Sequence, residues 1–140
     1  MVTLKLSMTA TGKLLTQDQA PALAKVMGDI IGELIQKGES LLDERLRPRP
    51  AGVYLSVGQA QRGHASTGHF RRSVNSRRSQ RNGIIQSNVV YGPWLEGDSA
   101  RNATSRFKGY QSFRKVGQEL EKGAGVVITR HANRFIRSLG

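Results

Sequence analysis

Apolar and polar residues alternate at the start of the chain and then recur at helical spacing. Val2, Leu4 and Leu6 alternate with polar neighbours, which is the two-residue period of a half-buried β-strand. Between residues 18 and 46 the apolar residues follow the 3.6-residue period of an amphipathic helix instead. These positions are Leu23, Met27, Ile30, Ile31, Leu34, Ile35, Leu41 and Leu42. The pattern therefore predicts a strand over 2–7 and a long helix over 18–46.

The predicted helix carries signals at both ends and an unusual pair of glycines inside. Asp18 is a suitable N-cap, and Pro21 is tolerated in the first turn. Arg47–Pro50, read Arg-Pro-Arg-Pro, ends the helix because a proline disfavours the α conformation in the residue before it. Gly28 and Gly32 lie one turn apart, and acidic residues beside them argue against a membrane-dimer motif. We expect these glycines to let the helix pack closely on a sheet.

The middle of the chain predicts further strands. Residues 53–57 alternate again and predict a second strand. Residues 67–74 predict a short helical turn that leads into two strands, 73–81 and 83–90. Asn82-Gly83 lies between these strands and is typical of a type I′ hairpin turn, in which both central residues adopt positive φ.

Two polar loops and a second helix complete the pattern. Residues 58–68 and 97–105 are polar and small, so we expect mobile loops there. Helical spacing returns from Tyr110 to Leu139. Lys122–Gly125 weakens it, because each glycine costs about 1 kcal/mol relative to alanine, and predicts a kink or break. The whole chain, residues 1–140, is expected to be a single α+β domain: a small antiparallel sheet with a long helix before it and a long, kinked C-terminal helix.

The charge distribution adds a preference for anionic partners. The 140 residues include no cysteine and carry a formal net charge of +12. Between Arg45 and Leu95 there are nine arginines and no acidic residue, whereas six of the ten acids lie between Asp18 and Glu44. This separation of acidic and basic segments suits head-to-tail self-association as well as binding of nucleic acid. No apolar run is long enough to span a bilayer and no signal peptide is apparent, so we expect no membrane partner and synthesis in the cytoplasm.

Catalytic and metal-binding patterns are weak. His64 and His69 have no acidic residue near them in the sequence, and His131 falls on the apolar stripe of the last helix, where a satisfied core histidine is expected. Glu96 and Asp98 are the only carboxylates in the basic half, and we expect Glu96 to form a salt bridge with a neighbouring arginine. The sequence predicts no enzyme, no cofactor and no metal site.

The arginines around the predicted hairpin are a candidate contact for phosphates or for an acidic protein. They are Arg71, Arg72, Arg77, Arg78 and Arg81. Each could neutralise one phosphate. Phe70 is the only aromatic residue among them, so base stacking is not expected, and no motif for reading a nucleic-acid sequence is present.

The segment Tyr91–Gly97, which reads Tyr-Gly-Pro-Trp-Leu-Glu-Gly, is the most informative part of the chain. Pro93 is expected to end the preceding strand, which leaves a large aromatic residue at a corner. Trp94 and Leu95 either cover the domain's own core or anchor an interface, because Trp, Tyr and Arg dominate interface energetics. The candidate interface residues are Tyr91, Trp94, Leu95, Glu96, Arg106, Phe107 and Tyr110.

These motifs together resemble a bacteriophage family. The order is Thr67-Gly68-x-Phe70-Arg71-x-Ser73-Val74, a hairpin, Val90–Gly97, a polar loop, and Arg106–Tyr110 before a final helix. It is similar to the head–tail joining or tail-completion (neck) proteins of long-tailed double-stranded-DNA phages, which are close to tail terminators. Phe70 replaces a leucine and Gly92 an alanine of the family pattern, and no proline separates Arg106 from Phe107.

The resemblance implies a structural virion protein without catalysis or cofactor. Such a subunit assembles into a ring, commonly a hexamer, at the junction between capsid neck and tail tube. Its partners would be other copies of itself and other neck and tail-tube proteins, with DNA passing through the channel. It would be made in the cytoplasm of the host bacterium. The alternative from charge alone is a stand-alone basic nucleic-acid-binding protein.

Overall fold

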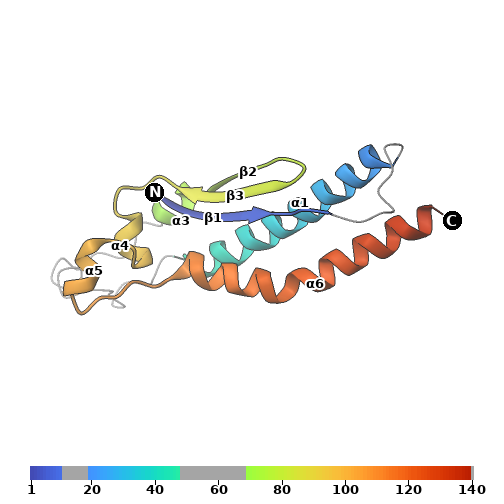
Figure 1. Cartoon of the computed structure of the whole chain (residues 1–140). Helices are drawn as coiled ribbons and strands as arrows, with labels where there is room; N and C mark the ends of the chain where they lie inside the picture. The colour runs from blue at the N-terminus through green and yellow to red at the C-terminus, as the bar shows by residue number, and fades with distance from the viewer. Residues whose placement is uncertain (11–18, 48–68, 140) are drawn as a thin grey trace.

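The fold joins a small sheet to two long helices (Figure 1). The computed structural model describes residues 1–10, 19–47 and 69–139. Its elements are β1 (Val2–Ser7), α1 (Ala20–Arg45), α3 (His69–Ser73), β2 (Asn75–Arg78), β3 (Asn82–Ser87), α4 (Gly92–Glu96), α5 (Ala100–Thr104) and α6 (Ser112–Ser138). The predicted α+β class, with an antiparallel sheet and long helices before and after the hairpin, is confirmed.

The sheet places β3 between the two other strands. The strand order is β1-β3-β2, and both pairings are antiparallel. Ile85 of β3 is fully buried and lies opposite Leu4 on one side and Ser76 on the other. The alternation predicted for residues 2–7 is confirmed, since Val2 is buried and its polar neighbour Thr3 is exposed.

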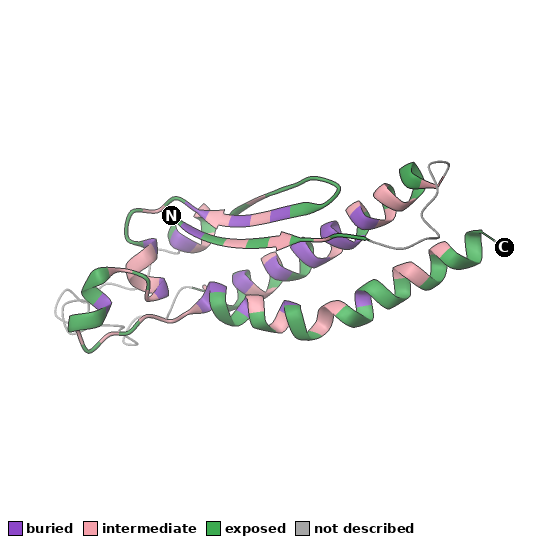
Figure 2. Cartoon of the chain, viewed as in Figure 1, coloured by how far each residue is buried: buried purple, intermediate pink, exposed green. Residues whose placement is uncertain are grey.

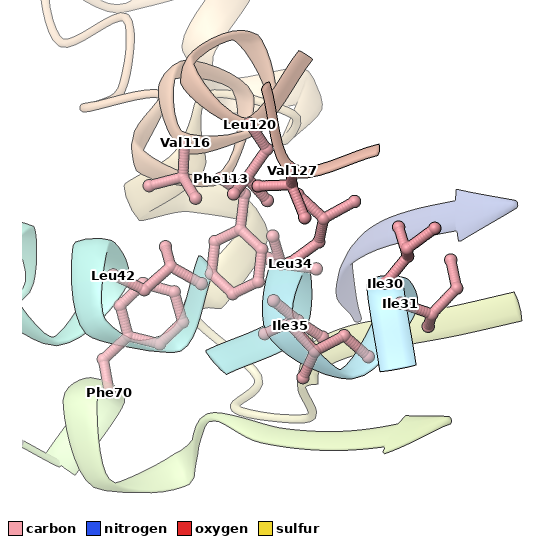
Figure 3. Packing of buried hydrophobic residues seen from close by; sticks show 12 residues of the cluster. Ile30, Ile31, Leu34, Ile35, Leu42, Phe70, Phe113, Val116, Leu120 and Val127 are labelled. Atoms are coloured by element: carbon pink, nitrogen blue, oxygen red, sulfur yellow. The ribbon is translucent and has the colours of Figure 1, made fainter. Parts of the chain in front are cut away.

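The core lies where α1, α6 and the sheet meet. Figure 3 shows side chains of α6 directed toward those of α1, with Phe70 of α3 beside Leu42. The buried apolar cluster consists of Val2, Ile30, Ile31, Leu34, Ile35, Leu42, Phe70, Ile85, Phe113, Val116, Leu120 and Val127. Figure 2 shows that burial is concentrated in the middle of the molecule and falls off toward the right-hand ends of both long helices. Apolar burial at this point therefore holds the fold together.

The start of α1 differs slightly from the prediction. Its N-cap residue is Gln19, whose side chain makes no capping hydrogen bond, and Asp18 lies outside the described residues. The close approach of the helix to the sheet that was expected at the two glycines is found at Gly32, where an added Cβ would meet the Arg78 side chain of β2. At Gly28 an added Cβ would lie 3.7 Å from the Cα of Gln80, which is an ordinary contact distance. The predicted strand over 53–57 and loop over 58–68 also lie outside the described residues.

The hairpin turn is not where the Asn82-Gly83 signal placed it. Both residues belong to β3, and Gly83 pairs with Leu6 and Arg78. Positive φ angles in the described chain occur only at Gly97, Gly109 and Gln111, so a type I′ turn at Asn82-Gly83 is wrong. A Cβ on Gly83 would overlap Ile35 and lie 3.0 Å from Ile31. This glycine is needed for close packing of β3 on α1. Both strands are shorter than predicted, since β2 begins at Asn75 and β3 ends at Ser87.

The last helix is continuous. α6 runs from Ser112 to Ser138 without a break at Gly123 or Gly125, although it bends near its middle in Figure 1. Among the described helices, none combines the length and apolar character that a membrane span requires.

Candidate functional site

The Tyr91–Gly97 corner folds as a short helix, α4. Pro93 occupies the first turn, where its missing N–H leaves no hydrogen bond unmade. Gly97 ends the helix with φ of 107°, a left-handed conformation that favours glycine, and its N–H donates to the Pro93 carbonyl at 2.9 Å. Proline at the start and glycine at the end therefore define a single compact turn of helix.

The corner is joined to the chain before α6 by backbone contacts. The N–H of Tyr110 donates to the Leu95 carbonyl at 2.7 Å, and the N–H of Gln111 donates to the Glu96 carbonyl at 3.0 Å. Gly109 has φ of 92°, and a Cβ on it would overlap the backbone of Gly97. The two glycines thus let the backbones touch, and the segments 91–97 and 106–110 form one unit, hereafter the corner unit.

Glu96 caps the last helix from inside this unit. Its carboxylate accepts the N–H of Phe113 at 3.0 Å and that of Arg114 at 2.9 Å, in the first turn of α6. A carboxylate here satisfies donors that a helix N-terminus leaves unpaired and interacts well with the helix dipole. The expected salt bridge to an arginine is therefore wrong. Burial raises the pKa of Glu96, although the two N–H groups oppose that shift.

Glu96 is 4% exposed, so it supports the corner unit from within instead of lying on a free surface. Leu95 beside it is half-buried and packs against the core. These two of the candidate interface residues hold the unit in place.

Three aromatic rings form the body of the corner unit. The Trp94 and Phe107 ring centroids are 5.1 Å apart, and those of Phe107 and Tyr110 are 5.0 Å apart in an edge-to-face arrangement. The Arg101 guanidinium lies 5.4 Å from the centroid of the Trp94 ring. All three aromatic residues are half-buried, so the unit covers part of its own aromatic surface with ring and cation–π contacts.

The remaining candidate interface residues are exposed. Tyr91 is 43% exposed, and its ring lies 6.2 Å from that of His69 and 6.4 Å from that of Phe70. Partial burial raises the pKa of its phenol. Val90 before it is 96% exposed, and Arg106 is exposed beside Phe107. An apolar side chain, a phenol and a guanidinium therefore face solvent at this end of the molecule.

The predicted loop over 97–105 contains a helix that sequence analysis missed. The N–H of Ser99 donates to the Asn102 side-chain oxygen at 2.9 Å, and the Ser99 hydroxyl accepts the N–H of Arg101 at 3.4 Å. Asn102 is buried, and its amide donates to the carbonyls of Trp94 and Phe107 at 3.1 Å each. The Ser99-x-x-Asn102 spacing, a variant of the capping box, was the signal that could have revealed α5.

The arginines of the hairpin region do not form one surface. Arg71 is bound by Asp43, with its Nε 2.6 Å from Oδ1, and this contact lowers the pKa of Asp43. Arg78 lies over α1, and its Nη1 donates to the Gly28 carbonyl at 3.4 Å. Arg72, Arg77 and Arg81 are exposed. Two of the five predicted contact residues are therefore engaged within the subunit.

The histidines do not gather into a catalytic or metal-binding group. His131 is half-buried, with Nε2 2.6 Å from a Glu33 carboxylate oxygen, and Glu33 also binds Arg130. Glu33 of α1 thus faces α6. His69 contacts Tyr91, and His64 lies outside the described residues. In the described part of the chain, no set of three or more His, Asp or Glu side chains is placed to hold a metal ion.

Comparisons with known proteins add no relative to this picture. No family model matches the chain, and neither a curated protein nor a solved structure matches it.

Proposed function

We propose that the chain is a structural subunit of a ring at the head–tail junction of a long-tailed double-stranded-DNA phage, as a joining or tail-completion protein. The observation that carries the proposal is the corner unit. The segments 91–97 and 106–110, which carry most of the resemblance to that family, lie side by side and are joined by the backbone bonds of Tyr110 and Gln111. Motifs that are separated in sequence therefore act as one structural feature.

The corner unit has the properties of an interface anchor. It lies at one end of the elongated molecule, beyond the sheet (Figure 1). Its shape is fixed before any partner binds, because Asn102 donates to the Trp94 and Phe107 carbonyls inside it and Glu96 ties it to the first turn of α6. Rigid aromatic residues with an adjacent arginine contribute most binding energy at interfaces, since little conformational entropy is lost on binding.

A ring is the assembly that such a one-sided anchor favours. The anchor of one subunit would contact a different surface of the next, and a heterologous contact closes into a ring when its rotation permits. Exposed Asp29 and Glu44 on α1 offer acidic groups for the basic residues of the corner unit. Other neck and tail-tube proteins would stack on the ring, which would reside in the virion after synthesis in the bacterial cytoplasm.

The test is assembly with and without an intact anchor. Tyr91→Ala/Arg106→Ala removes two exposed groups of the corner unit, and Ile136→Ala, at a 62% exposed position of distal α6, is the matched control. We expect solution mass and negative-stain images to show rings, or decorated ends of tail tubes from the same phage, for the unaltered protein and for the control only. A protein that stays monomeric and ignores tail tubes would contradict the proposal.

A stand-alone nucleic-acid-binding protein is the second candidate. It is favoured by the net charge of +12 and by exposed Arg77 and Arg81, which form no ion pair within the described residues. It predicts a monomer or dimer whose affinity for DNA falls steeply with salt and that does not associate with tails.

A further inference from the structure

The C-terminal half of α6 carries a row of arginines with almost no opposing charge. Arg130, Arg134 and Arg137 follow the i, i+4, i+7 spacing of one helix face. Helix geometry separates them by about 6 Å and about 4.5 Å along the axis. No acidic residue occurs after Glu121 in the sequence.

These arginines are accessible. Arg134 and Arg137 are exposed, and the Arg130 side chain is 50% exposed. The acidic contact found for this row is Glu33 of α1, which binds Arg130 and also His131. One carboxylate therefore offsets only part of the positive charge, and it acts at the end of the row nearest the core.

The surface around the row is an open, shallow groove. Gly125, Thr129 and Asn133 border the same shallow groove as the three arginines. A Cβ on Gly125 would meet nothing within 4 Å, so a partner could approach the helix backbone there. Hydroxyl and amide groups such as those of Thr129 and Asn133 commonly donate to phosphate oxygens beside arginines. Val126, which is 74% exposed, is the one apolar member of this surface.

We propose that this face of α6, the Arg130–Arg137 row, binds the phosphate backbone of double-stranded DNA. Duplex DNA carries one negative charge per about 1.7 Å of its axis, so a row about 10 Å long lies against several phosphates. The groove has no aromatic lining residue on which an unpaired base could stack, which favours a duplex over a single strand. The contact is to phosphates and therefore independent of DNA sequence.

This DNA-binding site on α6 is not the one that the sequence suggested, which was the group of arginines around the hairpin. Two hairpin-region arginines are already bound within the subunit, Arg71 by Asp43 and Arg78 at the Gly28 carbonyl. Arg77 and Arg81 remain exposed, but β2 is short and no third arginine continues their row in regular spacing. They provide a charge-matched comparison. The proposal does not depend on ring formation, because a single subunit presents the whole row.

The experiment compares two double variants of the full chain. Arg134→Ala/Arg137→Ala and Arg77→Ala/Arg81→Ala each remove two exposed positive charges. Binding to a 30-base-pair duplex is followed by fluorescence anisotropy over a series of salt concentrations. We expect the α6 variant to flatten the slope of log K against log salt by about 1.8, since each lost phosphate contact removes about 0.9. The hairpin variant keeps the slope of the unaltered protein, and both variants keep its melting temperature.

Several results would overturn the proposal. Equal losses in the two variants would mean that net charge alone drives binding. Failure of the unaltered protein to bind the duplex at 50 mM salt would exclude the site. Binding of poly-glutamate as tightly as of DNA would identify a surface for acidic proteins instead. Tail decoration, measured separately, reports on ring assembly, so either proposal can fail without the other.

Discussion

The two halves of α6 belong to one continuous helix and have opposite surroundings. Its buried residues are Ser112, Phe113, Val116, Leu120 and Val127, all in the first 16 of its 27 positions. Beyond Val127 the helix has exposed apolar residues, including Ile136 at 62% and Leu139 just past its end at 50%, together with the Arg130–Arg137 row. The first half is held by Glu96 at its start and by the core along its length.

This contrast separates the demands of folding from those of binding. In the first half, side chains fit against α1 and β1, so their size and shape are constrained by packing. In the second half, only the Glu33 contacts tie α6 to α1 among the ion pairs of the described residues. A helix that extends past its own core keeps a surface available, and the proposed DNA contact uses that surface.

The two halves of α6 should differ most in the stability that is lost when an apolar side chain is truncated. Leu120→Ala in the first half removes a side chain that is 1% exposed and leaves a cavity, so we expect a loss of about 2–5 kcal/mol in the free energy of unfolding. Ile136→Ala in the second half should change it by less than about 0.5 kcal/mol. Urea unfolding monitored by circular dichroism measures both. Similar losses at the two positions would mean that the second half is packed as tightly as the first.

Glycine-to-alanine substitutions should change the free energy of unfolding in opposite directions at a packed position and at an open one. A Cβ on Gly38 of α1 would lie 2.7 Å from Ile85 and 3.0 Å from Leu120, so Gly38→Ala should cost about 1–3 kcal/mol through overpacking. Gly125→Ala meets nothing within 4 Å and should stabilise the helix by up to about 1 kcal/mol. The same unfolding measurement applies. Stabilisation by Gly38→Ala would show that α1 and α6 can separate without loss.

Much of the fold follows from apolar periodicity. The strand at 2–7 and both long helices were predicted because their apolar residues keep a constant period over many positions. The hairpin turn was misplaced because Gly83 has a tertiary role: it makes room for Ile31 and Ile35, which lie far away in the sequence. A glycine's neighbours in sequence do not distinguish a turn from a close approach.

The sequence proposed which residues make up the candidate site but did not predict the contacts that they make with one another and with α6. Tyr91 and Arg106, which the sequence offered as interface residues, are exposed, whereas the sequence left open whether Trp94 covers the core or anchors an interface, and this residue is half-buried. The capping role of Glu96 could not be predicted, because its partners at Phe113 and Arg114 depend on how α4 folds back onto α6. Two glycines with positive φ make that fold possible, and such angles are not encoded in a periodic pattern.

The smallest expected effect is a pH dependence of the contacts between Glu33 of α1 and the second half of α6. Hydrogen bonds from His131 and Arg130 lower the pKa of Glu33 below its ordinary value of 4.5. A carboxyl group with a lowered folded-state pKa stabilises the fold above its unfolded pKa, and this stabilisation is lost as the pH falls through the folded-state value. Glu33→Gln should therefore show a smaller decrease in melting temperature than the unaltered protein on acidification below about pH 4.5.

The control for this prediction is Glu121→Gln, which alters an exposed carboxylate on α6 itself. Because burial raises the pKa of Glu96, that group acts in the opposite direction and stabilises the fold at low pH, in all three proteins alike. Differences between the melting curves therefore isolate Glu33. Hydrogen exchange at neutral pH should also be faster in residues 128–138 of Glu33→Gln and unchanged in 112–127. Faster exchange along the whole helix would mean that Glu33 supports both halves equally.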